Sequence, residues 1–225
     1  MANICIFGDS VARGVVIDEL KNKYSFLKEN FSYVMGEKNK NAVKNFAKFG
    51  CTVSKGIEVM KKKANQLSNY DFTILEFGGS DALLDWEEVS DCPYMDHTSK
   101  VPVDTFRERY SFLIKETKKA GTTPVLMTLP PVDSMKYFSW ISKDLDQESI
   151  LDFLDGDIDA LDEGHQEYNQ MIMDLANEYK VPLIDIHAEF LKQKDFKSLL
   201  CLDGVHPNKA GHQLMAQTIE SALNC

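Results

Sequence analysis

Short apolar runs alternate along the chain with longer segments in which apolar and polar positions recur at helical spacing. Five of the short runs have the length and composition of β-strands. The first, NICIF, is apolar after its asparagine and closes at Gly8, which is typical of a strand buried on both faces of a sheet. The predicted strands cover residues 3–7, 42–50, 70–79, 122–130 and 181–186.

The longer segments predict helices. In one of them, Ile57, Met60 and Ala64 fall on one side, while lysines occupy the other. Another begins at Asp104, a residue type that caps helix N-termini, and ends just before Gly121. The predicted helices cover residues 54–67, 104–120, 163–180 and 207–223.

Strands that alternate with helices predict a parallel sheet covered on both faces. We therefore expect an α/β fold, a three-layer α/β/α sandwich with a five-stranded parallel sheet. No linker or repeat divides the chain, so we expect one domain over residues 1–225. Residues 131–162 break the alternation, because they are rich in aromatic and acidic residues and contain no strand pattern. Such a helical insertion can form a small core of its own, and it can also cover a ligand crevice, because one role does not exclude the other.

The composition excludes several classes of protein. With 25 Lys and Arg against 35 Asp and Glu, the formal net charge is −10, which argues against a nucleic-acid partner. The chain has no membrane-span pattern and its N-terminus lacks a signal-peptide pattern, so we expect a cytoplasmic protein. The five cysteines never form a C-x-x-C spacing and the histidines are scattered. We therefore predict no disulfide framework, no metal and no cofactor.

Four stretches fall at the carboxyl-terminal edge of the predicted sheet. FGDSVARG places Ser10 at the start of the first helix, where its hydroxyl is exposed and nearby N–H groups can stabilise negative charge. Near the other end of the chain, DGVH places Asp203 three residues before His206. Gly50 follows the second strand and GGSD (residues 78–81) follows the third. Each stretch alone is explained by a helix cap or a turn, but their shared edge predicts a common site.

The residue types suit nucleophilic catalysis. A serine hydroxyl is a poor nucleophile unless a base takes its proton, and that base needs a third group to fix its tautomer. His206 and Asp203 are of the residue types that suit these two roles beside a serine such as Ser10, although a turn cap and a surface histidine explain the pair as well.

The four stretches, in this order, resemble those of the SGNH (GDSL-like) hydrolases, which have a flavodoxin-like α/β/α fold. The resemblance covers essentially the whole chain. It implies that Ser10 is the nucleophile, that His206 is the general base and then acid, and that Asp203 orients His206. It also implies an oxyanion hole formed by the N–H groups of Ser10 and Gly50 and by a side chain of the third stretch.

The third stretch departs from the family pattern, because Ser80 stands where the family has asparagine. An asparagine amide and a serine hydroxyl can both donate a hydrogen bond, but the serine side chain is shorter. Loss of one oxyanion donor costs about 10²–10³ in rate. We expect Ser80 to keep part of this role, directly or through a water, in an enzyme slower than its asparagine-bearing relatives.

The favoured interpretation is an esterase or lipase that acts on a small-molecule ester through an acyl-enzyme. Two alternatives stay open. The substrate could be an O-acetylated carbohydrate, or the protein could be a binding module that keeps the fold without turnover. A nucleotide-binding protein is a poorer interpretation, because no G-x-G-x-x-G or P-loop spacing follows the first strand. The sequence does not determine the acyl chain length, the alcohol or the oligomeric state.

Overall fold

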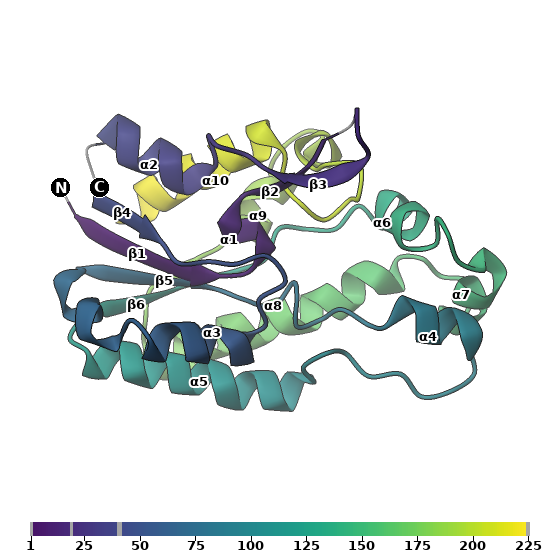
Figure 1. The fold of residues 1–225 in the computed structure, drawn as a ribbon, viewed down its shortest axis with the longest axis horizontal. Coiled ribbons are helices and arrows are strands. Elements are labelled where there is room, and N and C mark those ends of the chain that lie inside the picture. Colours follow the sequence, from purple (N-terminus) through teal and green to yellow (C-terminus); the bar gives the residue numbers. More distant parts are fainter. Residues whose placement is uncertain (1, 19, 40–41, 224–225) are drawn as a thin grey trace.

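The structure, a computed structural model, describes residues 2–18, 20–39 and 42–223 and has a parallel sheet between two layers of helices (Figure 1). The strand order of this sheet is β4-β1-β5-β6-β7, and every neighbouring pair is parallel. The predicted three-layer α/β/α fold with a five-stranded parallel sheet is therefore confirmed. The strands are β1 (Asn3–Gly8), β4 (Ala42–Asn45), β5 (Phe72–Glu76), β6 (Thr123–Met127) and β7 (Leu183–Ile184).

The observed strands are shorter than most of the predicted runs. In the run at residues 42–50, β4 ends at Asn45. The side chain of this residue donates to the carbonyl of Ala12 at 2.7 Å and accepts from the N–H of Ala47 at 2.9 Å, while the N–H groups of Phe46 and Lys48 still donate to β1 carbonyls. The last run ends early because Asp185 caps the helix that follows. Polar side chains at strand ends thus set the boundaries.

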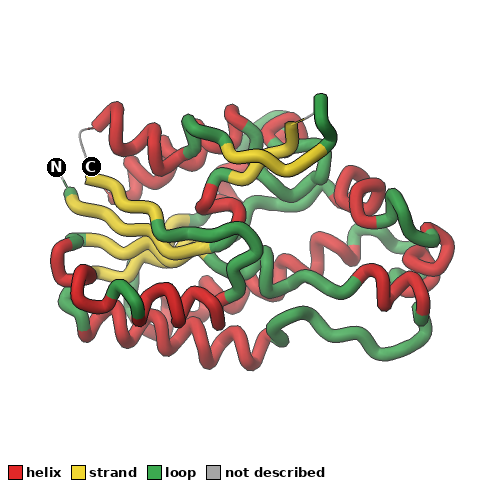
Figure 2. Tube along the Cα trace, in the orientation of Figure 1, coloured by secondary structure: helices red, strands yellow, loops and turns green. Residues whose placement is uncertain are grey.

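Helices cover both faces of the sheet, as the tube view shows (Figure 2). Successive residues of β1 serve opposite faces: Ile4 and Ile6 belong to one buried cluster, and Cys5 and Phe7 to the other. Full burial of such an aliphatic side chain stabilises the fold by about 1.5–3 kcal/mol. None of the helices in the described residues is both long and apolar enough to cross a bilayer. The layer with Ile4 contains α1 (Ser10–Arg13), α2 (Phe31–Asn39), α9 (Ile186–Leu191), the 3₁₀ helix Phe196–Leu199 and α10 (Lys209–Leu223), and the other contains α3 (Val53–Lys61), the 3₁₀ helix Ala64–Asn69, α5 (Val103–Lys119) and α8 (Ala160–Tyr179).

A third group of helices lies beyond the carboxyl ends of the strands, on the right in Figure 1. It consists of α4 (Trp86–Asp91), α6 (Ser134–Ile141) and α7 (Gln147–Phe153). These helices and the start of α8 share a small apolar cluster that includes Val89, Tyr137 and Leu161. Residues 131–162 thus contain α6, α7 and the first residues of α8. Their role as a cover over a ligand stays a prediction.

Several local features differ from the sequence analysis. A two-stranded antiparallel hairpin, β2 (Val15–Asp18) and β3 (Lys23–Phe26), was not predicted, and neither was α2. The signal for the hairpin is the alternation in VVID and KYSF around a turn in which Asn22 has a φ of 49°. The prediction of Asp104 as a helix cap was wrong. Pro102 occupies the cap position of α5, which leaves Asp104 in the first turn.

Candidate active site

Ser10 is the first residue of α1, directly after the turn that follows β1. Asp9 forms the N-cap of this helix, and its Oδ1 accepts the N–H of Val11 at 3.0 Å. The helix ends after a single turn at Gly14, which has a left-handed φ of 79°. A four-residue helix has a small dipole, so the charge stabilisation that the sequence analysis expected from it is correspondingly small. Oriented N–H groups at the turn are the relevant donors.

Ser10, His206 and Asp203 form a continuous chain of hydrogen bonds. The Ser10 Oγ lies 2.8 Å from His206 Nε2, and His206 Nδ1 lies 2.5 Å from Asp203 Oδ2. A carboxylate oxygen can only accept, so Nδ1 carries the proton and Nε2 is the acceptor for the serine hydroxyl. All three residues are more than 90% buried. The structure thus brings together three residues that the sequence analysis singled out, across 196 positions.

A tight turn positions the carboxylate and the imidazole. The Cys201 N–H donates to the His206 carbonyl at 2.8 Å, and Gly204, with a φ of 70°, lies at the apex of the turn. Asp203 Oδ1 accepts the N–H groups of Val205 and His206 at 3.2 and 3.1 Å. Burial alone would raise the pKa of Asp203, but the hydrogen bond and the electrostatic attraction to the His206 ring, with the two backbone N–H groups, outweigh burial and hold this pKa below its usual value. Asp203 is therefore anionic at neutral pH.

The residues expected to form the oxyanion hole differ in which of their hydrogen-bond donors are unused. Within the described residues, the N–H groups of Ser10 and Gly50 donate no hydrogen bond to the chain. Gly50 is exposed in the loop after β4 and has a left-handed φ of 64°. The N–H of Ser80 is already used, because it donates to Asp9 Oδ2 at 3.0 Å. Of the two donors of Ser80, only the hydroxyl makes no hydrogen bond to the described part of the chain.

Three buried carboxyl groups, those of Asp9, Glu76 and Asp81, lie near the loop that carries Ser80. Asp9 accepts backbone N–H groups from Val11 and Ser80, and Glu76 Oε2 accepts the N–H of Ala12 at 3.0 Å. Burial and the neighbouring charge of Asp9 raise the pKa of Glu76 well above its usual value, and burial also raises the pKa of Asp9, against the N–H groups that Asp9 accepts. The sequence analysis missed Glu76, whose only signal is an acidic residue at the end of a strand buried on both faces.

The third carboxyl group, Asp81, fixes the start of α3. Its Oδ1 and Oδ2 lie 2.9 and 3.2 Å from the N–H of Val53, which is the first residue of that helix. Burial is the main reason that the pKa of Asp81 is raised to about 7, and the nearby charge of Asp9 adds to it. Asp81 thus ties the loop that carries Ser80 to the helix after Gly50.

An aromatic group formed by Tyr24, Phe49 and Trp140 lies beside His206, and Tyr24 is the member that contacts the His206 ring. The ring of Tyr24, from β3, meets the His206 ring edge-on with 5.5 Å between centroids. Trp140 Nε1 donates to the Tyr24 hydroxyl at 3.0 Å, and the ring of Phe49 lies 5.3 Å from that of Tyr24. Burial and the charge of Asp203 raise the pKa of Tyr24 to about 12. The sequence analysis missed Tyr24 because it missed the hairpin that carries it.

Comparison with known proteins gives a family match and several similar folds. The sequence model of the GDSL-like lipase/acylhydrolase family matches residues 6–214. No curated protein is significantly similar in sequence to the chain.

Three solved structures illustrate the similarity of fold. A lipase/acylhydrolase from Enterococcus faecalis has a TM-score of 0.68 and 21% identity, with 97% of this chain and 93% of that chain covered. A member of the lipolytic G-D-S-L family from Veillonella parvula has a TM-score of 0.67 and 17% identity, with 99% and 98% covered. An acetyl xylan esterase, AlAXEase, has a TM-score of 0.67 and 20% identity, with 98% and 99% covered. At these identities the likeness demonstrates a shared fold.

Proposed function

Because the chain belongs to the GDSL-like lipase/acylhydrolase family, we propose that it hydrolyses carboxylic esters with Ser10 as nucleophile, His206 as base and Asp203 as the group that orients His206. The observation that carries this proposal is the continuous hydrogen-bond chain from the Ser10 hydroxyl through His206 to the Asp203 carboxylate. This is the arrangement that lets a weakly acidic hydroxyl lose its proton as it attacks.

The reaction takes place in two halves. Ser10 Oγ attacks the ester carbonyl carbon while its proton moves to His206 Nε2, and Asp203 stabilises the imidazolium that forms. The tetrahedral intermediate collapses when Nε2 gives that proton to the leaving alcohol, which leaves an acyl group on Ser10. A water molecule then attacks the acyl carbon, gives a proton to His206 and releases the acid, and the proton returns to Ser10.

Negative charge on the carbonyl oxygen is stabilised by the free N–H groups of Ser10 and Gly50 and by the Ser80 hydroxyl. Asp9 supports this role, because it holds the Ser80 backbone at 3.0 Å and so keeps the hydroxyl near the turn after β1. A hydroxyl that makes no hydrogen bond elsewhere in the described chain can rotate toward the oxyanion without losing a partner.

Hydrolysis of p-nitrophenyl esters from acetyl to palmitoyl tests the proposal. The wild-type protein should release p-nitrophenol, and Ser10→Ala, which removes the nucleophile, should abolish turnover without lowering the melting temperature by more than a few degrees. Equal activity in both proteins would refute the Ser10 mechanism. Absence of activity on every ester would favour the binding module.

An O-acetylated carbohydrate is a second candidate substrate. The aromatic group beside His206 favours it, because half-exposed rings such as Tyr24 and Trp140 suit the apolar face of a sugar. The fold similarity to an acetyl xylan esterase agrees with it. A kcat/KM that is higher for acetylated xylooligosaccharides than for p-nitrophenyl acetate would select this candidate.

A further inference from the structure

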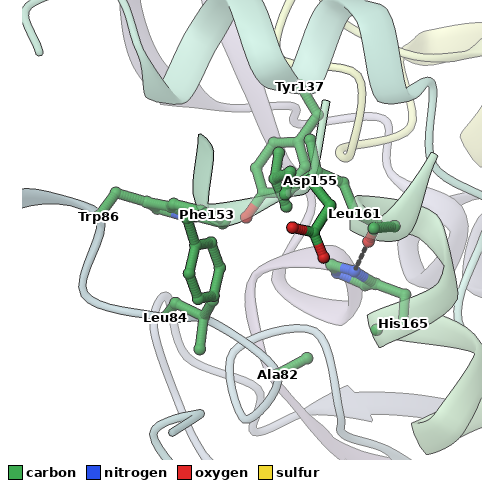
Figure 3. A pocket seen from close by; sticks show the side chains of 11 residues that line it. Ala82, Leu84, Trp86, Tyr137, Phe153, Asp155, Leu161 and His165 are labelled. Atoms are coloured by element: carbon green, nitrogen blue, oxygen red, sulfur yellow. Dashed lines mark hydrogen bonds between the residues drawn. The ribbon is translucent and has the colours of Figure 1, made fainter. Parts of the chain in front are cut away.

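A pocket of about 300 Å³ lies between the loop after β5 and helices α6, α7 and α8 (Figure 3). Its walls are mainly apolar, with the rings of Trp86, Tyr137 and Phe153 set edge-to-face and with Leu84 and Leu161 beside them. At about 30 Å³ for a group the size of water, this volume accommodates roughly ten non-hydrogen atoms. The pocket therefore has room for a ring with a short chain.

The pocket borders the candidate active site through two of the site's own segments. Ala82, which contributes to its lining, is two residues beyond Ser80 in the same loop. On the other side, the start of α6 packs on the turn that carries Asp203, because the Asp133 N–H donates to the Gly204 carbonyl at 2.9 Å. Val205, in that turn, packs against the same apolar cluster as the pocket walls. The pocket thus lies next to the segments that carry Ser80 and Asp203.

Two buried polar atoms of the lining have no hydrogen-bond partner within the described residues, Trp86 Nε1, which can only donate, and His165 Nε2. His165 is 95% buried, and its Nδ1 lies 3.2 Å from the Leu161 carbonyl. A carbonyl only accepts, so Nδ1 carries the proton and Nε2 is left as an acceptor. Within the described residues this Nε2 has no hydrogen-bond partner, which is unfavourable in a protein interior. Burial also lowers the pKa of His165, so the ring stays neutral at pH 7.

We propose that this pocket binds the acyl group of the ester, and that its preferred occupant is an aromatic acyl group of about ten non-hydrogen atoms whose distal hydroxyl donates to His165 Nε2. The proposal rests on the function proposed above. In that mechanism, the leaving alcohol must contact His206, where Tyr24 and Trp140 lie, and the carbonyl oxygen faces Ser80. The acyl chain is the remaining substituent of the carbonyl carbon, and we assign it to the pocket because the lining includes Ala82 of the Ser80 loop but neither Tyr24 nor Trp140.

The test uses p-nitrophenyl esters with one leaving group and three acyl groups: acetyl, 3-(4-hydroxyphenyl)propionyl and 3-(4-methoxyphenyl)propionyl. The methoxy group has nearly the same size but cannot donate a hydrogen bond. The wild-type kcat/KM should be at least tenfold higher for the hydroxyphenyl ester than for the acetyl ester. It should exceed that of the methoxy ester about three- to tenfold, the effect expected of one hydrogen bond.

Two variants test separately how the size of the pocket and its polar group affect the substrate preference. Gly164 lies in the lining, and a Cβ built on it meets nothing within 4 Å, so Gly164→Leu can narrow the pocket without a clash. This variant should lower the ratio of kcat/KM for the hydroxyphenyl ester to kcat/KM for the acetyl ester at least tenfold. His165→Phe should bring the ratio of kcat/KM for the hydroxyphenyl ester to that for the methoxyphenyl ester close to one. As a matched control, Ala64→Leu narrows another apolar pocket of about 300 Å³, near α3 and α5, and should leave both ratios unchanged.

Three results would overturn the proposal while leaving ester hydrolysis intact. The first is a hydroxyphenyl-to-acetyl ratio of kcat/KM in Gly164→Leu equal to that of the wild type. The second is a preference for the hydroxyphenyl over the methoxyphenyl ester that survives His165→Phe. The third comes from an added set of substrates, acetyl esters of arylalkyl alcohols, if Gly164→Leu lowers kcat/KM only for these. The last result would assign the pocket to the alcohol. If no ester is hydrolysed, the proposed function fails separately. Calorimetric titration of the Ser10→Ala protein with 3-(4-hydroxyphenyl)propionic acid then tests the pocket alone, and binding no tighter than for the Gly164→Leu, Ser10→Ala protein refutes it.

Discussion

Replacing Asp203 with asparagine should disable His206 by reversing its tautomer. Asp203 Oδ1 accepts two backbone N–H groups, from Val205 and His206, so the amide oxygen of the new side chain must take that position. Its NH₂ group then replaces Oδ2, which lies 2.5 Å from His206 Nδ1. Two donors cannot face each other, so Nδ1 loses its proton and Nε2 gains one. Nε2 then donates to the Ser10 hydroxyl, instead of accepting its proton.

The expected loss is about 10⁴-fold in kcat, which corresponds to about 5 kcal/mol of transition-state stabilisation. The assay is steady-state hydrolysis of p-nitrophenyl acetate at pH 7, with circular dichroism melting to establish that the variant is folded. Asp195→Asn is a suitable control, because Asp195 is exposed and makes no side-chain cap. A decrease in kcat smaller than tenfold in a folded Asp203→Asn protein would refute the proposed role of the carboxylate.

Three further predictions test the surroundings of the site. Ser80→Ala should lower kcat for p-nitrophenyl acetate ten- to a hundredfold, and an unchanged kcat would exclude the hydroxyl as an oxyanion donor. The folded state keeps a proton on Asp81 up to about pH 7, whereas the unfolded chain loses it near pH 4, so the free energy of unfolding falls as pH rises between these values. Asp81→Asn should remove about 2–3 kcal/mol of the decrease between pH 5 and pH 8, measured by urea unfolding, and an identical pH dependence in both proteins would contradict the raised pKa. Gly204→Ala should lower the free energy of unfolding by about 2–4 kcal/mol, because φ is 70° and the new Cβ would lie 2.5 Å from the Asp133 carbonyl and 2.8 Å from the Tyr137 nitrogen. A loss below 0.5 kcal/mol in urea would show that α6 can move away from this turn.

The sequence predicts the sheet and the positions of Ser10 and His206 because both depend on local signals. Apolar runs determine the strands, and the residues that follow parallel strands meet at one edge of the sheet whatever the lengths of the connections. The immediate neighbours of a strand end are therefore predictable. Asp203 belongs to the same class, because it is tied to His206 by a three-residue turn.

Other parts of the site depend on contacts between distant segments, and sequence patterns do not carry these. Tyr24 reaches His206 from a hairpin outside the main sheet, whose four-residue strands give a weak alternation signal. Glu76 looks like an ordinary strand residue until Asp9 is placed beside it. His165 was one of several scattered histidines, and only the packing of α6 and α7 on α8 turns it into part of a pocket.

The wide separation of Ser10 and His206 along the chain has a consequence for biosynthesis. At a translation rate of about 5–20 residues per second, roughly 10–40 s pass between the addition of these two residues to a growing polypeptide. During that interval β1, β4 and β5 are already available to pair, yet the serine has no partner to take its proton. Under the proposed mechanism, ribosome-bound chains that stop before the Asp203 turn should therefore be catalytically silent, and the onset of ester hydrolysis would mark synthesis of the Asp203–His206 segment rather than formation of the sheet.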